Sequence, residues 1–150
     1  MSEMIVRKAT EADIPQIAII EAESFSDPWT ENSLRSQLSQ AFGIFLAAED
    51  GNGKILGYII GSQDGESAFI DNIAVAVSAR KMGVGTALMK AFFETLPETV
   101  FIAILEVRVS NTAAQKLYSK FGFEAAGIRK NLYSSPRENG IVMTLDLKKD

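Results

Sequence analysis

The sequence predicts one α/β domain with a sheet of about seven strands and four helices. Three observations support this prediction: the chain has 150 residues, 47% of them are hydrophobic, and runs with a two-residue period are interspersed with runs of helical period. A chain of this length falls in the common size range of one domain and can bury a real core. We therefore expect residues 1–150 to form a single domain with one functional site.

The first half of the chain reads as a strand, two helices and an antiparallel meander. Residues 4–8 alternate apolar and polar side chains, as a short strand does. A helix capped by Thr10 or Asp13 should follow, and then a second helix that is capped by Thr30 and reaches residue 40. Strands are expected next, with an Asp-Gly turn in each connection, at residues 44–49, 55–63 and 67–75.

The second half alternates strands and helices and ends in two strands. A polar, glycine-containing segment leads into a helix whose apolar residues recur up to Leu96, where Pro97 stops it. A β-rich run, a helix closed by Gly122 and two final strands around a polar loop should then occupy residues 101–109, 111–121, 124–129 and 141–147. The complete predicted order is β-α-α-β-β-β-α-β-α-β-β.

The composition excludes several kinds of site and partner. The chain has neither cysteine nor histidine, which excludes disulfides, thiolate metal sites, a cysteine nucleophile and every Ser-His-Asp triad. Acid-base chemistry must therefore use carboxylates, tyrosine, lysine or water. The net charge of -4 lacks the basic footprint of a nucleic-acid binder, and no signal peptide or membrane span is recognisable. We expect a cytoplasmic protein with no metal, nucleic acid or membrane partner.

The segment Arg-Lys-Met-Gly-Val-Gly-Thr at residues 80–86 lies between a predicted strand and a predicted helix. Free backbone N–H groups and the helix dipole favour an anion there, Gly83 and Gly85 allow a phosphate to approach, and Lys81 adds positive charge. No dinucleotide fingerprint is complete, because Leu88 stands where a third glycine is needed, and no P-loop is present. Taken in isolation, a Gly-x-Gly favours an ordinary helix-capping turn over a phosphate site.

The run Ile73-Ala74-Val75 followed by Arg80-x-x-Gly83-x-Gly85 resembles the acetyl-CoA motif of the GCN5-related N-acetyltransferase (GNAT) superfamily. The order of elements resembles the GNAT fold along the whole chain, which implies a mixed, mostly antiparallel central sheet. In this family the strand binds the pantetheine arm of coenzyme A, and the loop and helix start bind its pyrophosphate. By position, the resemblance implies arm contacts from Ile73, Ala74 and Val75 and pyrophosphate contacts from Lys81, Met82, Gly83, Val84, Gly85 and Thr86.

Glu106 and Tyr118 are the candidate proton-transfer groups. Glu106 is the one carboxylate in the aliphatic run 101–109, where desolvation tends to raise a carboxyl pKa. A salt bridge with Arg108, two residues further along the strand, is an equally supported interpretation. Tyr118 follows Leu117 on a helix with an apolar stripe, so it is either an ordinary core tyrosine or a proton donor.

The segment LEVRVSNTAAQKLYSKFGFE is similar to the matching region of bacterial ribosomal-protein alanine N-acetyltransferases, the RimI type. The resemblance implies that Glu106 accepts a proton from the substrate amine, that Tyr118 donates one to the departing thiolate, and that Asn111 contacts coenzyme A. The backbone N–H of Val75 is, by position, the leading candidate to polarise the thioester carbonyl. Direct attack by the amine needs no covalent enzyme intermediate.

Two further segments bear on the acceptor amine. Residues 23–30 resemble an aromatic-Pro-Trp segment of RimI-type enzymes, in which Trp29 is a candidate substrate contact or the core of a packed turn. Residues 129–140 resemble the loop that shapes the peptide pocket, with Tyr133 as a candidate contact and Glu138 as a partner for a basic peptide residue. Leu132 and the Glu-Asn-Gly triplet depart from the paired tyrosines and Glu-Asp-Ala of the family, which leaves the peptide preference open.

The resemblance thus implies acetyl transfer from acetyl-CoA to a protein N-terminus, with the N-terminal alanine of a small-subunit ribosomal protein as the first candidate. Two alternatives remain open: another acceptor, such as a lysine side chain or a small-molecule amine, and a non-catalytic acyl-CoA-binding module. The sequence predicts no oligomeric state, and a monomer is the default.

Overall fold

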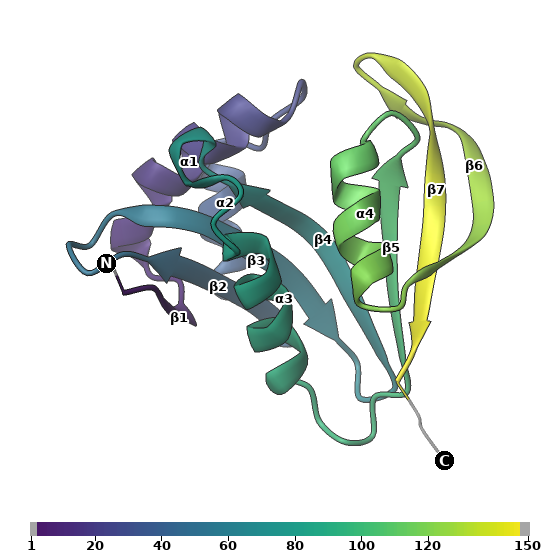
Figure 1. Cartoon of the computed structure of the whole chain (residues 1–150), viewed down its shortest axis with the longest axis horizontal. Helices are drawn as coiled ribbons and strands as arrows, with labels where there is room; N and C mark the ends of the chain where they lie inside the picture. Colours follow the sequence, from purple (N-terminus) through teal and green to yellow (C-terminus); the bar gives the residue numbers. More distant parts are fainter. Residues whose placement is uncertain (1–2, 148–150) are drawn as a thin grey trace.

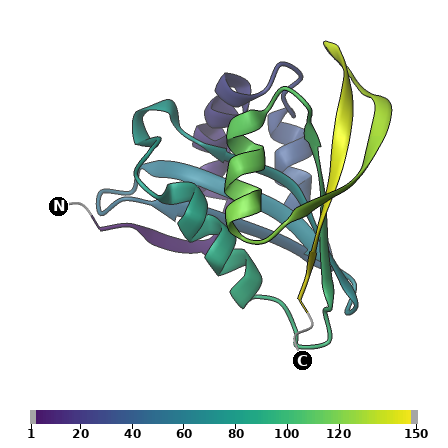
Figure 2. The same cartoon turned by 45° about the vertical axis from the view of Figure 1, so that its right-hand side comes forward.

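A computed structural model describes residues 3–147 and contains one seven-stranded sheet with two helices on each face (Figures 1 and 2). Its strand order is β1-β2-β3-β4-β5-β7-β6. The strands and helices follow along the chain as β1 (Ile5–Lys8), α1 (Ile14–Ser24), α2 (Glu31–Gln37), β2 (Gly43–Glu49), β3 (Ile55–Gln63), β4 (Ser67–Val75), α3 (Val84–Glu94), β5 (Ile102–Arg108), α4 (Thr112–Lys120), β6 (Glu124–Ser134) and β7 (Arg137–Asp146).

The predicted α/β class and the order of strands and helices are confirmed. The structure adds two short 3-10 helices, Glu11–Asp13 before α1 and Val77–Ala79 after β4. The prediction was wrong at the end of the chain, where residues 130–140 continue a long hairpin instead of forming a polar loop. Strand β6 lies at the edge of the sheet and is exposed along most of its length, so it lacks the apolar alternation that marks a half-buried strand.

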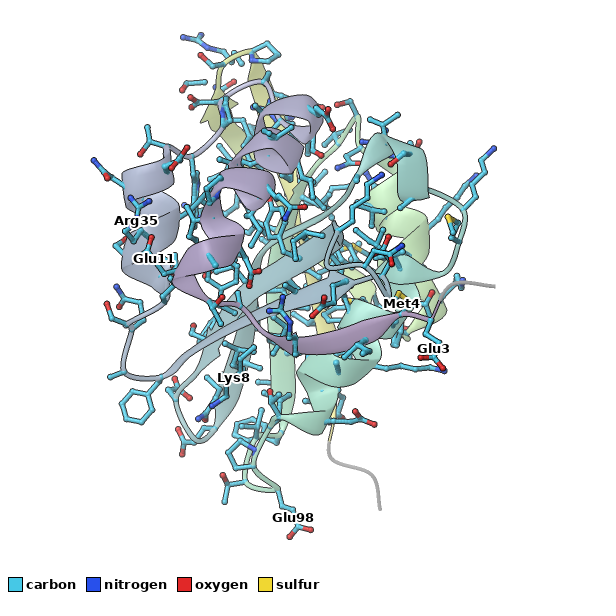
Figure 3. All side chains as sticks on the ribbon, turned by 90° about the vertical axis from the view of Figure 1, so that its left-hand side faces the viewer. Glu3, Met4, Lys8, Glu11, Arg35 and Glu98 are labelled. Atoms are coloured by element: carbon cyan, nitrogen blue, oxygen red, sulfur yellow. The ribbon has the colours of Figure 1, made fainter. Side chains whose placement is uncertain are left out.

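Local side-chain contacts explain how the N-terminal helices begin. The Thr10 and Asp13 pair forms a capping box on the first 3-10 helix, so α1 itself begins at Ile14. Thr30 caps α2 as predicted, since its hydroxyl accepts a hydrogen bond from the Ser33 N–H at 3.1 Å. Figure 3 shows Arg35 of α2 beside Glu11, and this ion pair ties the two helical segments together.

Helices α1 and α3 pack on opposite faces of the central strands. Tyr58 of β3 is fully buried on the α1 side. The neighbouring Gly57 and Gly61 face α3, where an added Cβ would lie 3.1 Å from Val84 and 2.6 Å from Phe92. Small residues on β3 therefore let α3 approach the sheet closely.

Strands β4 and β5 form the one parallel pair in the described sheet, and they pair along only part of their length. Their register runs from Ser67 opposite Ile102 to Ile70 opposite Leu105 and then stops. A bulge in the β3–β4 pairing falls at the same level of β4. Beyond it, β4 and β5 separate toward their carboxyl ends (Figure 1).

Candidate active site

The separation of β4 from β5 leaves one edge of β4 without a strand partner. The Ala76 N–H donates to the Leu56 carbonyl on the β3 side at 2.8 Å. Because backbone groups alternate between the two edges of a strand, the N–H groups of Val75 and Ile73 point to the other edge. No described strand pairs with that edge beyond Ile70, so these groups are available to a ligand.

The segment between β4 and α3 holds two residues in the left-handed region, Lys81 with φ 66° and Gly83 with φ 80°. Gly83 is the N-cap of α3 and contributes no side chain, so no side-chain group caps the first N–H groups of the helix. These uncapped groups belong to Val84, Gly85 and Thr86, and Lys81 beside them is exposed. A helix start of this kind is suited to a phosphate group.

The two glycines of this segment are required for different reasons. Nothing lies within 4 Å of a Cβ added to Gly83, so its positive φ is what favours glycine there. Gly85 has no positive φ, but its Cβ would lie 3.2 Å from the Leu117 Cδ2 atom of α4. Gly85 therefore allows the close approach of α3 and α4, a reason that the sequence alone did not reveal.

Asn111 begins α4 beside this region. Its Oδ1 accepts a hydrogen bond from the Ala114 N–H at 3.2 Å, which caps the helix. Within residues 3–147, its side-chain NH2 group donates no hydrogen bond. This group is therefore available to a ligand.

Glu106 is the first β5 residue beyond the last pair with β4. Its side chain is 35% exposed and forms an ion pair with Arg129 of β6 at 2.5 Å. The neighbouring Leu105 and Val107 are buried on the opposite face, so the aliphatic run does not surround the carboxylate as the sequence suggested. The alternative pairing with Arg108 is also wrong, because the ion pair of that arginine is with Glu138.

Tyr118 is 6% exposed and packs its ring edge-on against Phe123, with 5.9 Å between ring centroids. Burial raises the pKa of Tyr118, and the nearby Tyr133 raises it further. Burial and then the negative charge of Glu106 likewise raise the pKa of Tyr133. Tyr133 is thus the residue through which Tyr118 and the Glu106 carboxylate are linked electrostatically. Its burial and ring packing make Tyr118 a core tyrosine, and its hydroxyl makes no hydrogen bond to another described residue.

Arg108 fastens the tip of the β6–β7 hairpin. Its guanidinium donates to the Pro136 and Ser135 carbonyls at 2.9 and 3.1 Å and lies 4.4 Å from the centroid of the Tyr133 ring. It also donates to Glu138, whose second oxygen accepts from the Ser110 N–H at 2.6 Å. The hydrogen bonds from Ser110 and then from Arg108 lower the pKa of Glu138. The Glu138 carboxylate is therefore already held by groups of its own chain.

The segment that carries Trp29 meets this hairpin. The Ser26 hydroxyl donates to the Ser135 carbonyl at 2.6 Å, and the half-buried Trp29 packs against the core. The structure thus brings the segments of Trp29 and Tyr133 together, although they are about a hundred residues apart. We refer below to these two segments, residues 25–30 and 133–138, as the acceptor wall.

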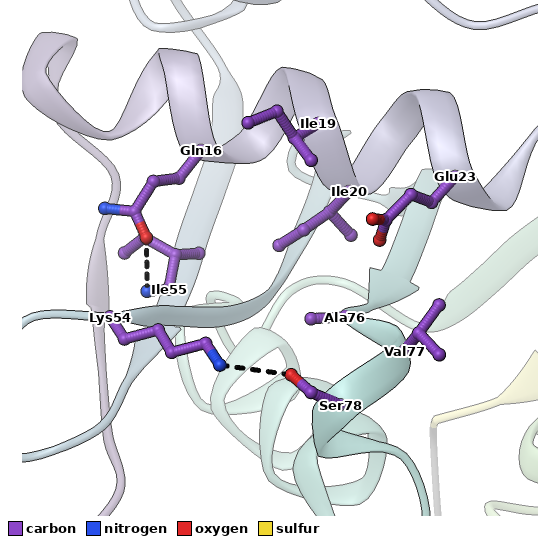
Figure 4. Close-up of a pocket in the computed structure, with 9 residues that line it drawn as sticks. All are labelled: Gln16, Ile19, Ile20, Glu23, Lys54, Ile55, Ala76, Val77 and Ser78. Atoms are coloured by element: carbon purple, nitrogen blue, oxygen red, sulfur yellow. Dashed lines mark hydrogen bonds between the residues drawn. The ribbon is translucent and has the colours of Figure 1, made fainter.

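A pocket of about 370 Å³ lies outside this region, between α1 and the segment that follows β4 (Figure 4). Gln16 accepts from the Ile55 N–H at 2.9 Å on one side of it, and Lys54 donates to Ser78 at 3.1 Å on the other. No residue that the sequence predicted for the site lines this pocket. Residues 3–147 contain no cluster of three or more His, Cys, Asp or Glu side chains able to hold a metal ion. No helix among the same residues is long and apolar enough to cross a membrane.

The sequence pattern of the acetyltransferase (GNAT) family matches residues 14–123. The chain belongs to the GNAT family. Members of this family use acetyl-CoA, and the present GNAT protein is an acetyl-CoA-dependent N-acetyltransferase, which confirms the predicted enzyme class. The uncapped start of α3 and the free edge of β4 fit such a substrate.

Individual GNAT proteins resemble the chain over nearly its whole length. The Escherichia coli ribosomal protein bS18-alanine N-acetyltransferase is 33% identical over 138 residues, which cover 90% of this chain and 92% of that protein. The crystal structure of the E. coli enzyme superposes with a TM-score of 0.87 at 30% identity, covering 99% of this chain and 96% of the other. Ard1 from Thermoplasma volcanium gives a TM-score of 0.86 at 28% identity, covering 97% and 99%.

Proposed function

We propose that this GNAT protein acetylates the N-terminal amine of a protein, with the N-terminal alanine of a small-subunit ribosomal protein as its first substrate. The observation that carries the proposal is the separation of β4 and β5, since it leaves the free edge of β4 opposite Glu106 and beside the acceptor wall. The E. coli relative named for alanine acetylation of bS18 supports this choice of acceptor. The proposal treats the chain as a single domain that acts in the cytoplasm.

Acetyl-CoA supplies an acetyl group activated as a thioester. In the proposal, the residues of the β4 edge hold the pantetheine arm, and the start of α3 holds the pyrophosphate through backbone N–H groups. The Asn111 amide adds a contact at the start of α4. The complete set is Ile73, Ala74, Val75, Lys81, Met82, Gly83, Val84, Gly85, Thr86 and Asn111.

Glu106 is the proposed base. An N-terminal amine has a pKa of about 8 and is mostly protonated at neutral pH, so a proton must leave before the amine can attack. Glu106 accepts this proton directly or through a water molecule. Its ion pair with Arg129 does not prevent this role, because the pair is exposed and such pairs contribute only about 0–1 kcal/mol.

Two further groups of the chain act on the thioester of acetyl-CoA. The Val75 N–H, on the free edge of β4, donates to the thioester carbonyl oxygen. Tyr118 donates a proton to the departing thiolate. Burial raises the pKa of this phenol further above the value near 8.5 of a thiol, so we assign most of the rate effect to the base.

The acceptor wall supplies the proposed peptide contacts, Trp29 and Tyr133. Glu138 was predicted to bind a basic peptide residue, but Arg108 and Ser110 already occupy its carboxylate. We therefore propose that Glu138 holds the β6–β7 hairpin in place beside the peptide.

A panel of amines tests the proposed acceptor. The purified protein is incubated with acetyl-CoA and three substrates: a peptide beginning with alanine, the same peptide with a blocked N-terminus and an added lysine, and free polyamines. Mass spectrometry then locates the acetyl group. Acetylation of the α-amine of the first peptide alone is the expected result. Transfer only to lysine or polyamines would overturn the proposed acceptor while leaving the enzyme class intact.

A further inference from the structure

Glu21 of α1 is a buried carboxylate that the proposed reaction does not use. It is 1% exposed, and Asp13 is the other fully buried acidic residue in the described part of the chain. Asp13 has Arg7 as an ion-pair partner, whereas Glu21 has no cationic partner among residues 3–147. A buried carboxylate without a cation is costly unless several hydrogen bonds compensate for its lost hydration.

Three donors from separate segments provide these hydrogen bonds. Glu21 Oε1 accepts from the Tyr58 hydroxyl of β3 and from Asn72 Nδ2 of β4, the latter at 2.8 Å. Glu21 Oε2 accepts from the backbone N–H of Trp29 at 3.0 Å. Burial and then the negative charge of Glu21 raise the pKa of Tyr58, which keeps the phenol protonated as a donor.

Two of these donors lie at opposite sides of the proposed site. Asn72 sits at the β4 bulge, beyond the last β4–β5 pair and directly before the Ile73 that begins the free edge. Trp29 belongs to the acceptor wall, which Ser26 ties to the β6–β7 hairpin through Ser135. The Glu21 carboxylate thus connects β4, the strand proposed to bind acetyl-CoA, to the acceptor wall, which is proposed to bind the amine substrate.

We infer that Glu21 is a positioning residue that fixes the acceptor wall at Trp29 relative to the acetyl-CoA strand at Asn72. Its kinetic consequence rests on the proposed function, whereas the link itself does not. Transfer needs the amine and the thioester carbon in near-attack geometry, and a misplacement of about 1 Å can lower the rate about 100-fold. A carboxylate is suited to this link, because its two oxygens can accept from both sides at once.

The variant Glu21→Gln separates the two sides of the link. A carboxamide keeps one acceptor oxygen, which can still serve Tyr58 and Asn72, but it turns an NH2 group toward the Trp29 N–H. The bond to Trp29 is therefore lost while the bond to β4 can remain. Glu23→Gln is the matched control, because Glu23 lies on the same helix, is exposed and hydrogen-bonds to no other described residue (Figure 4).

Two measurements report on the variant. Trp29 is the only tryptophan of the chain, so its fluorescence and the hydrogen exchange of its amide follow the acceptor wall without any need for turnover. Steady-state kinetics with an alanine peptide and calorimetry with acetyl-CoA then measure the two substrates separately. We expect Glu21→Gln to speed Trp29 amide exchange about 10-fold or more and to lower kcat/KM for the peptide about 10- to 100-fold. Acetyl-CoA affinity should stay within about two-fold of wild type, and Glu23→Gln should match wild type throughout.

A folded Glu21→Gln protein with unchanged Trp29 exchange, or with faster exchange but an unchanged kcat/KM for the peptide, would overturn the inference. If Glu21→Gln does not fold, Asn72→Ala tests the link from the strand side. It should lower kcat/KM for the peptide at least about 10-fold with acetyl-CoA affinity retained, and an unchanged kcat/KM would contradict the inference. A wild-type protein that acetylates no peptide would overturn the proposed function instead, and Trp29 exchange would still decide whether the link exists.

Discussion

Replacing Gly83 tests whether the left-handed start of α3 forms the acetyl-CoA site. Gly83 has φ 80°, a conformation that costs an ordinary L-residue about 1–2 kcal/mol. An alanine Cβ would meet nothing within 4 Å, so Gly83→Ala carries this conformational cost without a steric one. If the segment keeps its conformation without ligand, the cost lowers Tm by about 2–8 °C for a chain of this size. If the segment relaxes, the same free energy weakens acetyl-CoA binding by about 5- to 30-fold.

Thermal unfolding and calorimetric titration with acetyl-CoA measure the two effects on one sample. Gly83→Asn is the control, since asparagine adopts the left-handed region more readily than alanine. This variant should show smaller losses of Tm and of acetyl-CoA affinity than Gly83→Ala. The two losses expressed as free energies should together reach about 1–2 kcal/mol in Gly83→Ala. Unchanged Tm and unchanged affinity in Gly83→Ala would refute the assignment of this segment.

Three further predictions concern the proposed proton donor Tyr118, the β6–β7 hairpin and the N-terminal ion pair. Tyr118→Phe should lower kcat by no more than about 10-fold in peptide acetylation assays, because a thiolate whose conjugate acid has a pKa near 8.5 can leave without an acid; a loss above about 100-fold would contradict the minor role of the acid. Arg108→Gln should lower the free energy of unfolding by about 2 kcal/mol in urea titrations, because it removes charged hydrogen bonds to the hairpin tip. An unchanged urea midpoint would contradict the stabilising role of Arg108 at the hairpin tip. The hydrogen bond from Arg7 lowers the pKa of Asp13, so this pair stabilises the fold above the unfolded pKa of about 3.9 and loses its effect as pH falls through the lower folded value. Asp13→Asn should flatten the decline of Tm as the pH falls below about 4, and an unchanged decline would contradict the stabilising role of this ion pair.

Features encoded by neighbouring residues were predictable from the sequence. The strand, glycine segment and helix around Gly83 follow from local period and turn chemistry, and the Thr30 cap follows from residue type and spacing. The segment from Leu105 to Glu124 indicated β5, α4 and the start of β6 in the correct order. These elements carry Glu106 on β5 and Tyr118 on α4.

Partners that are distant in sequence were not predictable. Arg129 of β6 reaches Glu106 of β5 across the intervening β7, and no local pattern encodes that strand order. The ion pair of Arg108 with Glu138 was not predictable for the same reason, because it also depends on the strand order. The sequence did not single out Glu21, because its partners Tyr58 and Asn72 lie 37 and 51 residues away. Buried polar networks of this kind become visible only when the fold brings their members together.

The role of Glu106 as the base is the central claim, and one measurement tests it most directly. Glu106→Gln keeps the size of the side chain but removes its ability to accept a proton at neutral pH. At saturating acetyl-CoA and alanine peptide, kcat should fall by about 100- to 10,000-fold, while calorimetry should find acetyl-CoA affinity within about two-fold of wild type. Glu124→Gln, at an exposed carboxylate of β6, should behave like wild type. An unchanged kcat in Glu106→Gln would show that another group takes the proton and would contradict this account.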